Sequence, residues 1–155
     1  MSGPYWDDEH LGYAQKLLDP ADALLLGRDT YEVFAGSWPD REGDYADTLN
    51  AMPKHVASRT LTETTWNASL IEGDAAEGVA ALKAQDGGDI LKYGTGELDR
   101  ALAEQRLVDE FHFWVFPVVA GQGDRLFDGL DLTTLKLVET SRFASGIVVL
   151  VYAHA

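Results

Sequence analysis

The sequence predicts an α/β fold with a mostly parallel central sheet, flanking helices and an antiparallel hairpin at the C-terminus. Two patterns support this prediction. Up to about residue 105, short apolar runs alternate with segments of helical periodicity, which is typical of β-α-β units. After residue 109, strand-like runs follow one another with no helical segment between them. The 155 residues are enough for one substantial core, so we expect a single domain over residues 1–155.

The first half of the chain opens with a helix and then alternates strand and helix. Over residues 8–18 apolar residues recur at helical spacing, acidic residues crowd the start, and Pro20 follows the end. The apolar run 22–26 is closed by Gly27, which indicates a buried strand. The elements predicted for this half are helix 8–18, strand 22–26, helix 29–35, helix 41–52, strand 54–58 and a short strand at 69–72.

The second half ends in strands. An alanine-rich helix is stopped by Gly87 and Gly88. Aromatic and β-branched residues are densest at 110–119, and Pro117 inside this run predicts a sheet edge or a bulge. The elements predicted for this half are helix 75–85, strand 89–93, helix 98–105, strand 110–119, and a hairpin of strands 135–142 and 146–152.

Composition excludes several classes of function. The net charge of −14 disfavours nucleic acid or an anionic membrane as the main partner, because both would repel the protein. The absence of cysteine excludes disulfides, thiolate metal sites and a cysteine nucleophile. The four histidines are scattered without metal-ligand spacing, so no metal site is expected. The N-terminus lacks the features of a signal peptide, and no apolar run could span a membrane, so we expect a cytoplasmic protein.

Three short turns each follow a predicted strand. They are Gly27-Arg28-Asp29-Thr30-Tyr31, Ser58-Arg59-Thr60 and Gly94-Thr95-Gly96. Each offers backbone N–H groups, hydroxyls or a guanidinium where a helix or turn begins. Because parallel strands end at the same edge of a sheet, we expect these turns to form a phosphate-binding ledge and hence a nucleotide site.

These turns and several later motifs stand in one order over nearly the whole chain. The segments concerned are 23–32 (Ala-Leu-Leu-Leu-Gly-Arg-Asp-Thr-Tyr-Glu), 54–61 (Lys-His-Val-Ala-Ser-Arg-Thr-Leu), 94–98 (Gly-Thr-Gly-Glu-Leu), 107–111, 117–123 and 125–127. In this order they resemble the dihydrofolate-reductase-like domain that is shared with the C-terminal reductase half of the bacterial riboflavin deaminase/reductase. The resemblance implies a dihydrofolate-reductase-like fold.

The resemblance also implies an NADPH-dependent reductase of a small heterocycle of the pterin or pyrimidine kind. In the family the first and third turns lie against the cofactor pyrophosphate, and the second turn lies beside the adenosine 2′-phosphate. A 2′-phosphate needs a cation, so Arg59 favours NADP over NAD. The cofactor-binding residues implied are Gly27, Arg28, Thr30, Ser58, Arg59, Thr60, Gly94, Thr95, Gly96, Glu97 and Leu98.

The same turns also have a purely structural interpretation. Arg28 would then pair with a neighbouring acid, and Ser58 or Thr60 would accept hydrogen bonds from free backbone N–H groups. Glu97 would repel a pyrophosphate, so we expect its carboxylate to cap the helix that follows. An alternative function is therefore a non-catalytic dimeric module of the same fold that binds a nucleotide or another small ligand.

The sequence departs from the family pattern at its start. The family begins with a hydrophobic strand that ends in an Asp-Gly turn and lies beside the nicotinamide and the substrate, whereas this chain opens at Gly3-Pro4-Tyr5-Trp6. We therefore expect an open slot in the sheet, which truncation, a partner or a rearranged segment would explain. No catalytic residue is identified. Asp7, Asp8 and Glu9 either reach the pocket as proton donors or complement the dipole of the first helix.

Aromatic residues supply the remaining expectations. Trp6, Tyr31 and Trp38 are candidate substrate-binding residues, although core packing is an alternative for each of them. Trp6 and Trp38 are preferred, because they flank loops near the first turn. The run 110–119 carries aromatic side chains on both of its faces, more than one side of an edge strand can bury. This predicts a homodimer formed through the C-terminal strands.

Overall fold

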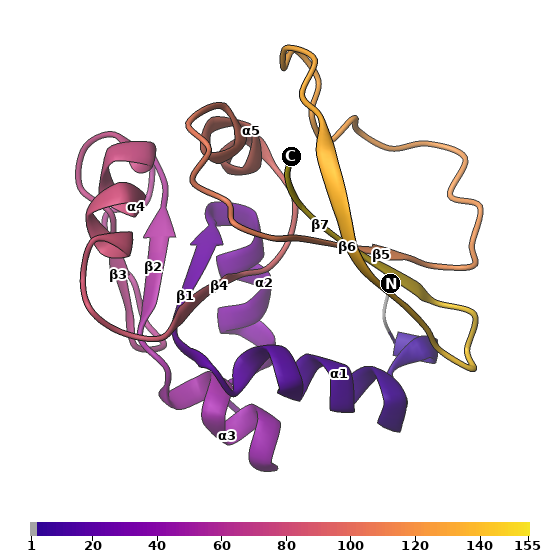
Figure 1. Cartoon of the computed structure of the whole chain (residues 1–155). Helices are drawn as coiled ribbons and strands as arrows, with labels where there is room; N and C mark the ends of the chain where they lie inside the picture. Colours follow the sequence, from indigo (N-terminus) through magenta and orange to yellow (C-terminus); the bar gives the residue numbers. More distant parts are fainter. Residues whose placement is uncertain (1–2) are drawn as a thin grey trace.

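The computed structural model describes residues 3–155, which form two sheets and the helices that cover them (Figure 1). The helical elements are η1 (Gly3–Tyr5), α1 (Asp8–Leu18), α2 (Arg28–Ser37), α3 (Asp44–Ala51), α4 (Ala75–Lys83) and α5 (Glu97–Glu104). The strands are β1 (Ala21–Gly27), β2 (Lys54–Ala57), β3 (Ala68–Leu70), β4 (Asp89–Lys92), β5 (Phe111–Val115), β6 (Leu135–Arg142) and β7 (Val148–His154).

The first sheet is parallel throughout, in the order β3-β2-β1-β4. Strand β1 lies inside this sheet, and both of its faces are buried. Its successive side chains point to opposite faces of the sheet. Leu24 packs in a core cluster with residues of α1 and α3, and Leu26 packs with Tyr31 of α2. Leu25 packs with residues of α4 and α5. Helices therefore cover both faces, as the alternating sequence pattern predicts.

The second sheet is antiparallel, in the order β5-β7-β6. Its inner face lies on α1, where Tyr13 contacts Trp114 and Phe143 with ring centroids 5.2 and 5.7 Å apart. Ala14 and Leu18 of the same helix belong to the core cluster of the parallel sheet. Helix α1 thus packs against both sheets and joins them.

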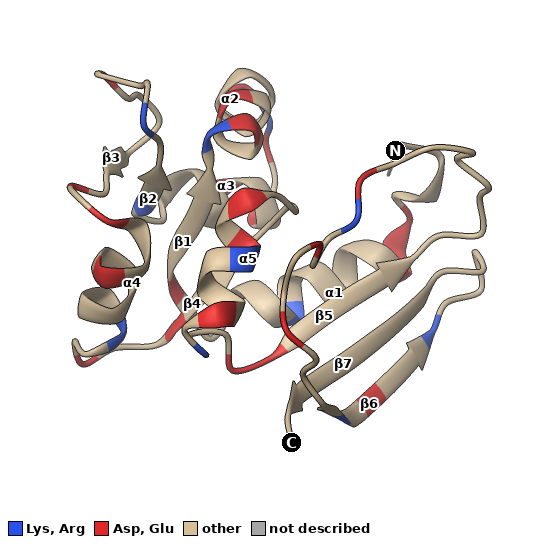
Figure 2. Ribbon diagram, turned by 90° about the horizontal axis from the view of Figure 1, so that it is seen from above, with Lys and Arg blue, Asp and Glu red and all other residues tan. Residues whose placement is uncertain are grey.

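The predicted fold class is confirmed, including the antiparallel C-terminal hairpin, but the strands form two sheets rather than one. Strand β4 pairs only with β1, and β5 pairs only with β7. These two edges are the ones that the sheets turn toward each other (Figure 2). Among residues 3–155 no strand lies between them, so the first strand of the family pattern has no counterpart in this part of the chain.

Element boundaries deviate from the predictions where special residues intervene. Strand β5 stops at Val115 instead of continuing to residue 119, because Pro117 has no N–H to donate to a ladder. Helix α3 begins at Asp44 rather than residue 41, after Gly43 with its φ of +113°. Helix α1 has the predicted bounds, and Asp7 caps it by accepting a hydrogen bond from the His10 N–H at 2.9 Å.

Lys54 is a buried lysine at the start of β2, with only 1% of its surface exposed. Its ammonium donates to the carbonyl of Asn50 at 2.8 Å and lies 4.0 Å from the ring centroid of Trp66. Among the described residues no carboxylate pairs with it, and burial lowers the pKa of Lys54 to about 8. Burial of this cation therefore lowers the stability of the folded protein at neutral pH.

This cost predicts an unusual pH dependence of stability. Between pH 8 and about pH 10 the unfolded chain keeps the Lys54 proton and the folded chain loses it, so the free energy of unfolding should rise with pH, by at most about 1.4 kcal/mol per unit. Burial raises the pKa values of Tyr45 and Tyr93, which reverses the trend above this window. Lys54→Met should flatten the rise in urea-unfolding titrations, whereas Lys16→Met on the exposed face of α1 should keep it. A rise that is unchanged in Lys54→Met would contradict this account.

Candidate functional site

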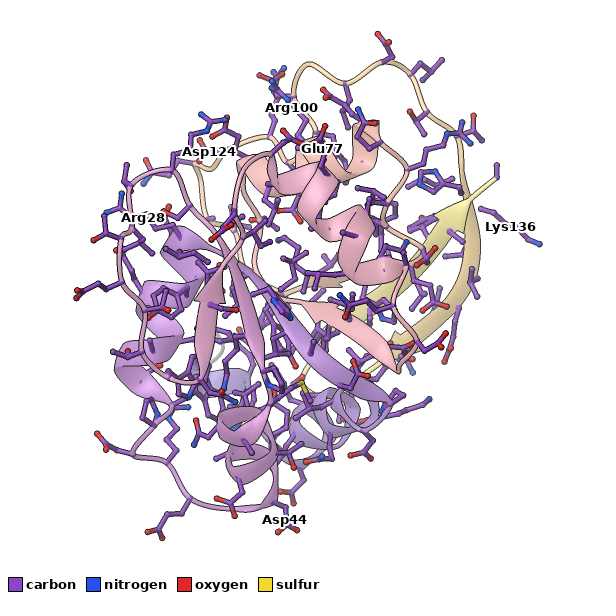
Figure 3. All side chains as sticks on the ribbon, turned by 90° about the vertical axis from the view of Figure 1, so that its left-hand side faces the viewer. Arg28, Asp44, Glu77, Arg100, Asp124 and Lys136 are labelled. Atoms are coloured by element: carbon purple, nitrogen blue, oxygen red, sulfur yellow. The ribbon has the colours of Figure 1, made fainter. Side chains whose placement is uncertain are left out.

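The three turns singled out from the sequence lie at one edge of the parallel sheet. Strands β1, β2 and β4 end at Gly27, Ala57 and Lys92, and their parallel pairing brings these ends together. Arg28, in the first turn, lies at the upper left of the molecule in Figure 3. We call residues 27–31, 58–60 and 94–98 the ledge.

The first turn contacts the second through Arg28. The Arg28 Nη1 donates to Thr60 Oγ1 at 2.8 Å, and the Arg28 Nε lies 3.2 Å from Glu32 Oε1 one helical turn on. Gly27 is the N-cap residue of α2, and no side chain of the described residues caps this helix. The first backbone N–H groups of α2 are thus available to an anion.

The second turn contacts the third through Arg59. Its Nη2 lies 3.3 Å from Glu97 Oε1, and both side chains are exposed. The Ser58 hydroxyl oxygen accepts from the N–H groups of Thr60 at 3.2 Å and Leu61 at 3.0 Å, so it holds the turn in shape. The structural interpretation of Ser58 and of the Arg28–acid pair is therefore satisfied, while Arg59 remains at the surface with an exposed guanidinium.

The third turn is tightly constrained. Gly94 has a φ of +80°, and a side chain there would overlap Thr30 Oγ1 of the first turn. The Lys92 ammonium contacts Asp99 Oδ1 at 2.8 Å and the Gly94 carbonyl at 3.0 Å. Asp99 Oδ2 accepts from the Gly96 N–H at 2.6 Å. The cap expected from Glu97 is therefore supplied by Asp99, and Glu97 pairs with Arg59 instead.

The other ledge residues take different positions. Thr30 is half-buried against Gly94, and Thr95 is exposed. Leu98 points away from the ledge into the core cluster of Leu25, Val79 and Leu102, so its contribution is to seat α5 rather than to contact a ligand by its side chain. The ledge as a whole combines two guanidinium groups with the uncapped start of α2, which suits phosphate oxygens.

Two of the three candidate substrate residues meet in a groove. Trp6 and Trp38 lie with ring centroids 6.0 Å apart in a cavity of about 510 Å³ between α1 and the segment 38–46. Tyr31 does not line this cavity. It is 5% exposed, and its hydroxyl accepts from the Thr65 N–H at 2.8 Å.

The three acidic residues near the N-terminus have different roles. Asp7 caps α1, and Glu9 accepts from the N–H of Ala144 at 2.7 Å, so both carboxylates serve the backbone. Asp8 is exposed and lines the groove. Of the three acids considered as proton donors, only Asp8 is in a position to meet a ligand there.

Sequence reasoning missed Lys92, Asp99 and Tyr45. Asp99 stands three residues after Gly96, at the spacing of a capping box, and this signal could have identified it. Tyr45 lines the groove, and its hydroxyl lies 2.8 Å from that of Tyr93, which directly precedes Gly94. The sequence carries no signal for this long-range pair.

Among residues 3–155 no three histidine or acidic side chains gather in a way that could hold a metal ion. No helix in this range has the length and apolar character needed to cross a membrane.

Comparison with known proteins identifies the family. Residues 2–149 match the family model of the RibD C-terminal domain. The chain is 34% identical over 151 residues to the uncharacterised Bacillus subtilis protein YyaP, covering 94% of this chain and 80% of that protein. It is 28% identical over 150 residues to YwjB of the same organism, also uncharacterised, covering 92% and 82%.

Two solved structures share the fold. A candidate riboflavin biosynthesis protein from a Shewanella species has a TM-score of 0.74 at 21% identity, over 96% of this chain and 80% of that one. A pyrimidine reductase-like protein from Corynebacterium diphtheriae has a TM-score of 0.71 at 15% identity, over 100% and 84%. The two sheets, the ledge turns in their order and the match over residues 2–149 agree: this chain belongs to the RibD C-terminal domain family.

Proposed function

We propose that this protein is a cytoplasmic, NADPH-dependent reductase of a small, planar heterocycle. The observation that carries the proposal is the interlocking of the three ledge turns. Arg28 joins the first to the second, Arg59 joins the second to the third, and Gly94 packs on Thr30 to join the third to the first. Side chains that serve packing alone have no need to gather two guanidinium groups at the open start of a helix.

The residues present suit a nicotinamide dinucleotide phosphate. Gly94 packs on Thr30 with no room for a side chain, so the third turn lies close to the first, and the backbone there and the uncapped N-terminus of α2 suit a cradle for the pyrophosphate. Thr30 and Thr95 offer hydroxyl donors nearby. Arg59 has the exposure and charge needed to meet a 2′-phosphate, which would displace Glu97 from it. The cofactor would supply a hydride, and the protein would hold its phosphates and orient it.

Hydride transfer is tested by turnover. Purified protein should oxidise NADPH anaerobically in the presence of at least one member of a panel of pyrimidines, pteridines and quinolines, as followed by absorbance at 340 nm. The Gly94→Ala variant, which should bind NADPH more weakly, gives the background rate of NADPH oxidation. Saturable NADPH binding without oxidation in any mixture would reject the reductase and favour the non-catalytic binding module. One observation favours that second candidate: β4 and β5 each leave an unpaired edge in the described part of the sheets.

We also propose that the protein is a homodimer through its C-terminal strands. Phe111 and Phe113 stack on the outer face of β5 and are only partly covered by Phe127 from the loop before β6. On the same face Val115 and Leu137 are 52% and 49% exposed. A second copy would remove this apolar surface from water.

A further inference from the structure

The groove between α1 and the segment 38–46 lies away from the ledge. Asp44, which lines the groove, lies at the lower end of the molecule in Figure 3, well apart from Arg28 of the ledge at the upper left. Helix α2 connects the two regions, and its 10 residues span about 15 Å. The Tyr45–Tyr93 hydroxyl contact links the groove floor to the residue before Gly94. The groove is thus a separate cavity that remains connected to the ledge by packed side chains.

Aromatic rings form the floor of the groove. Trp6, Trp38 and Tyr45 lie with ring centroids between 5.4 and 6.0 Å apart. Trp6 is 37% exposed, and His10 packs against it at 4.5 Å. Burial lowers the pKa of His10, so this neighbour adds no positive charge at neutral pH. A flat ring system can therefore stack on an exposed indole here.

The rim of the groove is acidic. Asp8, Glu42 and Asp44 line it together with a single base, Arg41. Among the described residues none of these four forms an ion pair. The Arg41 guanidinium instead lies 4.4 Å from the ring centroid of Trp38. A cation already stacks on this aromatic surface, and the remaining charge around it is negative, which is the chemistry that recognises flat cations.

We propose that this groove is a ligand site of its own, separate from the ledge, and that it binds a planar heteroaromatic cation without a phosphate group. Binding at this groove does not depend on the proposed reductase activity. The repulsion between three carboxylates and a phosphate disfavours phosphorylated heterocycles.

A series of ligands that differ in charge tests the proposal. Isothermal titration calorimetry at pH 7.5 would compare N-methylquinolinium, quinoline and quinoline-3-carboxylate, which share a ring system and carry charges of plus one, zero and minus one. The cation should bind about 3- to 10-fold more tightly than quinoline, and the carboxylate should bind most weakly. Trp6→Leu should weaken all three.

Matched variants separate the groove from the overall charge of the protein. Glu42→Gln/Asp44→Asn should remove most of the preference for the cation, whereas Glu77→Gln/Asp124→Asn, far from the groove in Figure 3, should retain it. Carboxylate binding equal to or tighter than that of the cation, or the same loss in both double variants, would overturn the proposal. NADPH is titrated separately. Binding of the cation without binding of NADPH would support the groove as a ligand site and contradict the proposed reductase function.

Discussion

Arg59→Ala should weaken NADPH binding by about 10- to 100-fold and leave NADH binding within about twofold. The guanidinium is exposed at the ledge, and among residues 3–155 its one ion-pair partner is Glu97, so its removal costs the fold little. A charge-assisted contact to a phosphate contributes roughly 1.5–3 kcal/mol, and only NADPH carries the 2′-phosphate. In the variant Glu97 would also face that phosphate without a counter-charge. The measurement is a pair of binding isotherms at fixed salt.

Two controls accompany this variant. Arg125→Ala removes an equally exposed arginine from the loop before β6 and should change neither isotherm. Arg59→Lys retains the charge and should recover part of the NADPH affinity, although lysine lacks the planar fork. An equal loss of affinity for NADPH and NADH in Arg59→Ala would remove Arg59 from recognition of the 2′-phosphate.

Gly94→Ala should reduce binding of both cofactors, by about 10-fold or more, because it disturbs the turn rather than one charge. Alanine at a φ of +80° costs roughly 1–2 kcal/mol, and its methyl group would overlap Thr30 Oγ1. Relief requires the third turn to move away from the first, which opens the pyrophosphate cradle. Thermal unfolding recorded with the isotherms shows whether the variant remains folded at the binding temperature.

Gly96→Ala is the matched control, two residues along the same turn. Gly96 has a φ of 173°, which any residue adopts, and open space surrounds the position of its side chain. This variant should cost less than about 1 kcal/mol of stability, since only the N-cap preference is affected. If Gly94→Ala bound both cofactors as tightly as the wild type does, the cradle would not be part of the cofactor site.

Local sequence signals predicted the elements well where caps and breakers define them. Helix α1 has its predicted bounds because Asp7 and Pro20 flank it. The division into two sheets was not predictable in this way, since strand pairing depends on contacts between residues far apart in sequence. Pro117 predicted an edge or a bulge in the run that contains β5, but no local signal showed that β4 would be an edge as well.

The candidate site was likewise predictable only in part. Each ledge turn could be located because it follows a strand, whereas the contacts Arg28–Thr60 and Arg59–Glu97 join residues 32 and 38 positions apart and required the fold. Tyr31 and Trp38 were both candidate substrate residues, but Tyr31 lies in the first turn of α2 and Trp38 is the C-cap of this helix, about 10 Å farther along its axis. Trp38 therefore reaches the groove, and Tyr31 packs against Thr65 beneath the ledge.

A direct titration tests whether the ledge is a cofactor site. Purified wild-type protein would be titrated with NADPH and, in parallel, with NADH, following the quenching of tryptophan fluorescence at two salt concentrations. The account predicts saturable binding of NADPH in the micromolar range, much weaker binding of NADH, and a loss of NADPH affinity at higher salt. No saturable binding of NADPH, or equal binding of the two dinucleotides, would contradict it.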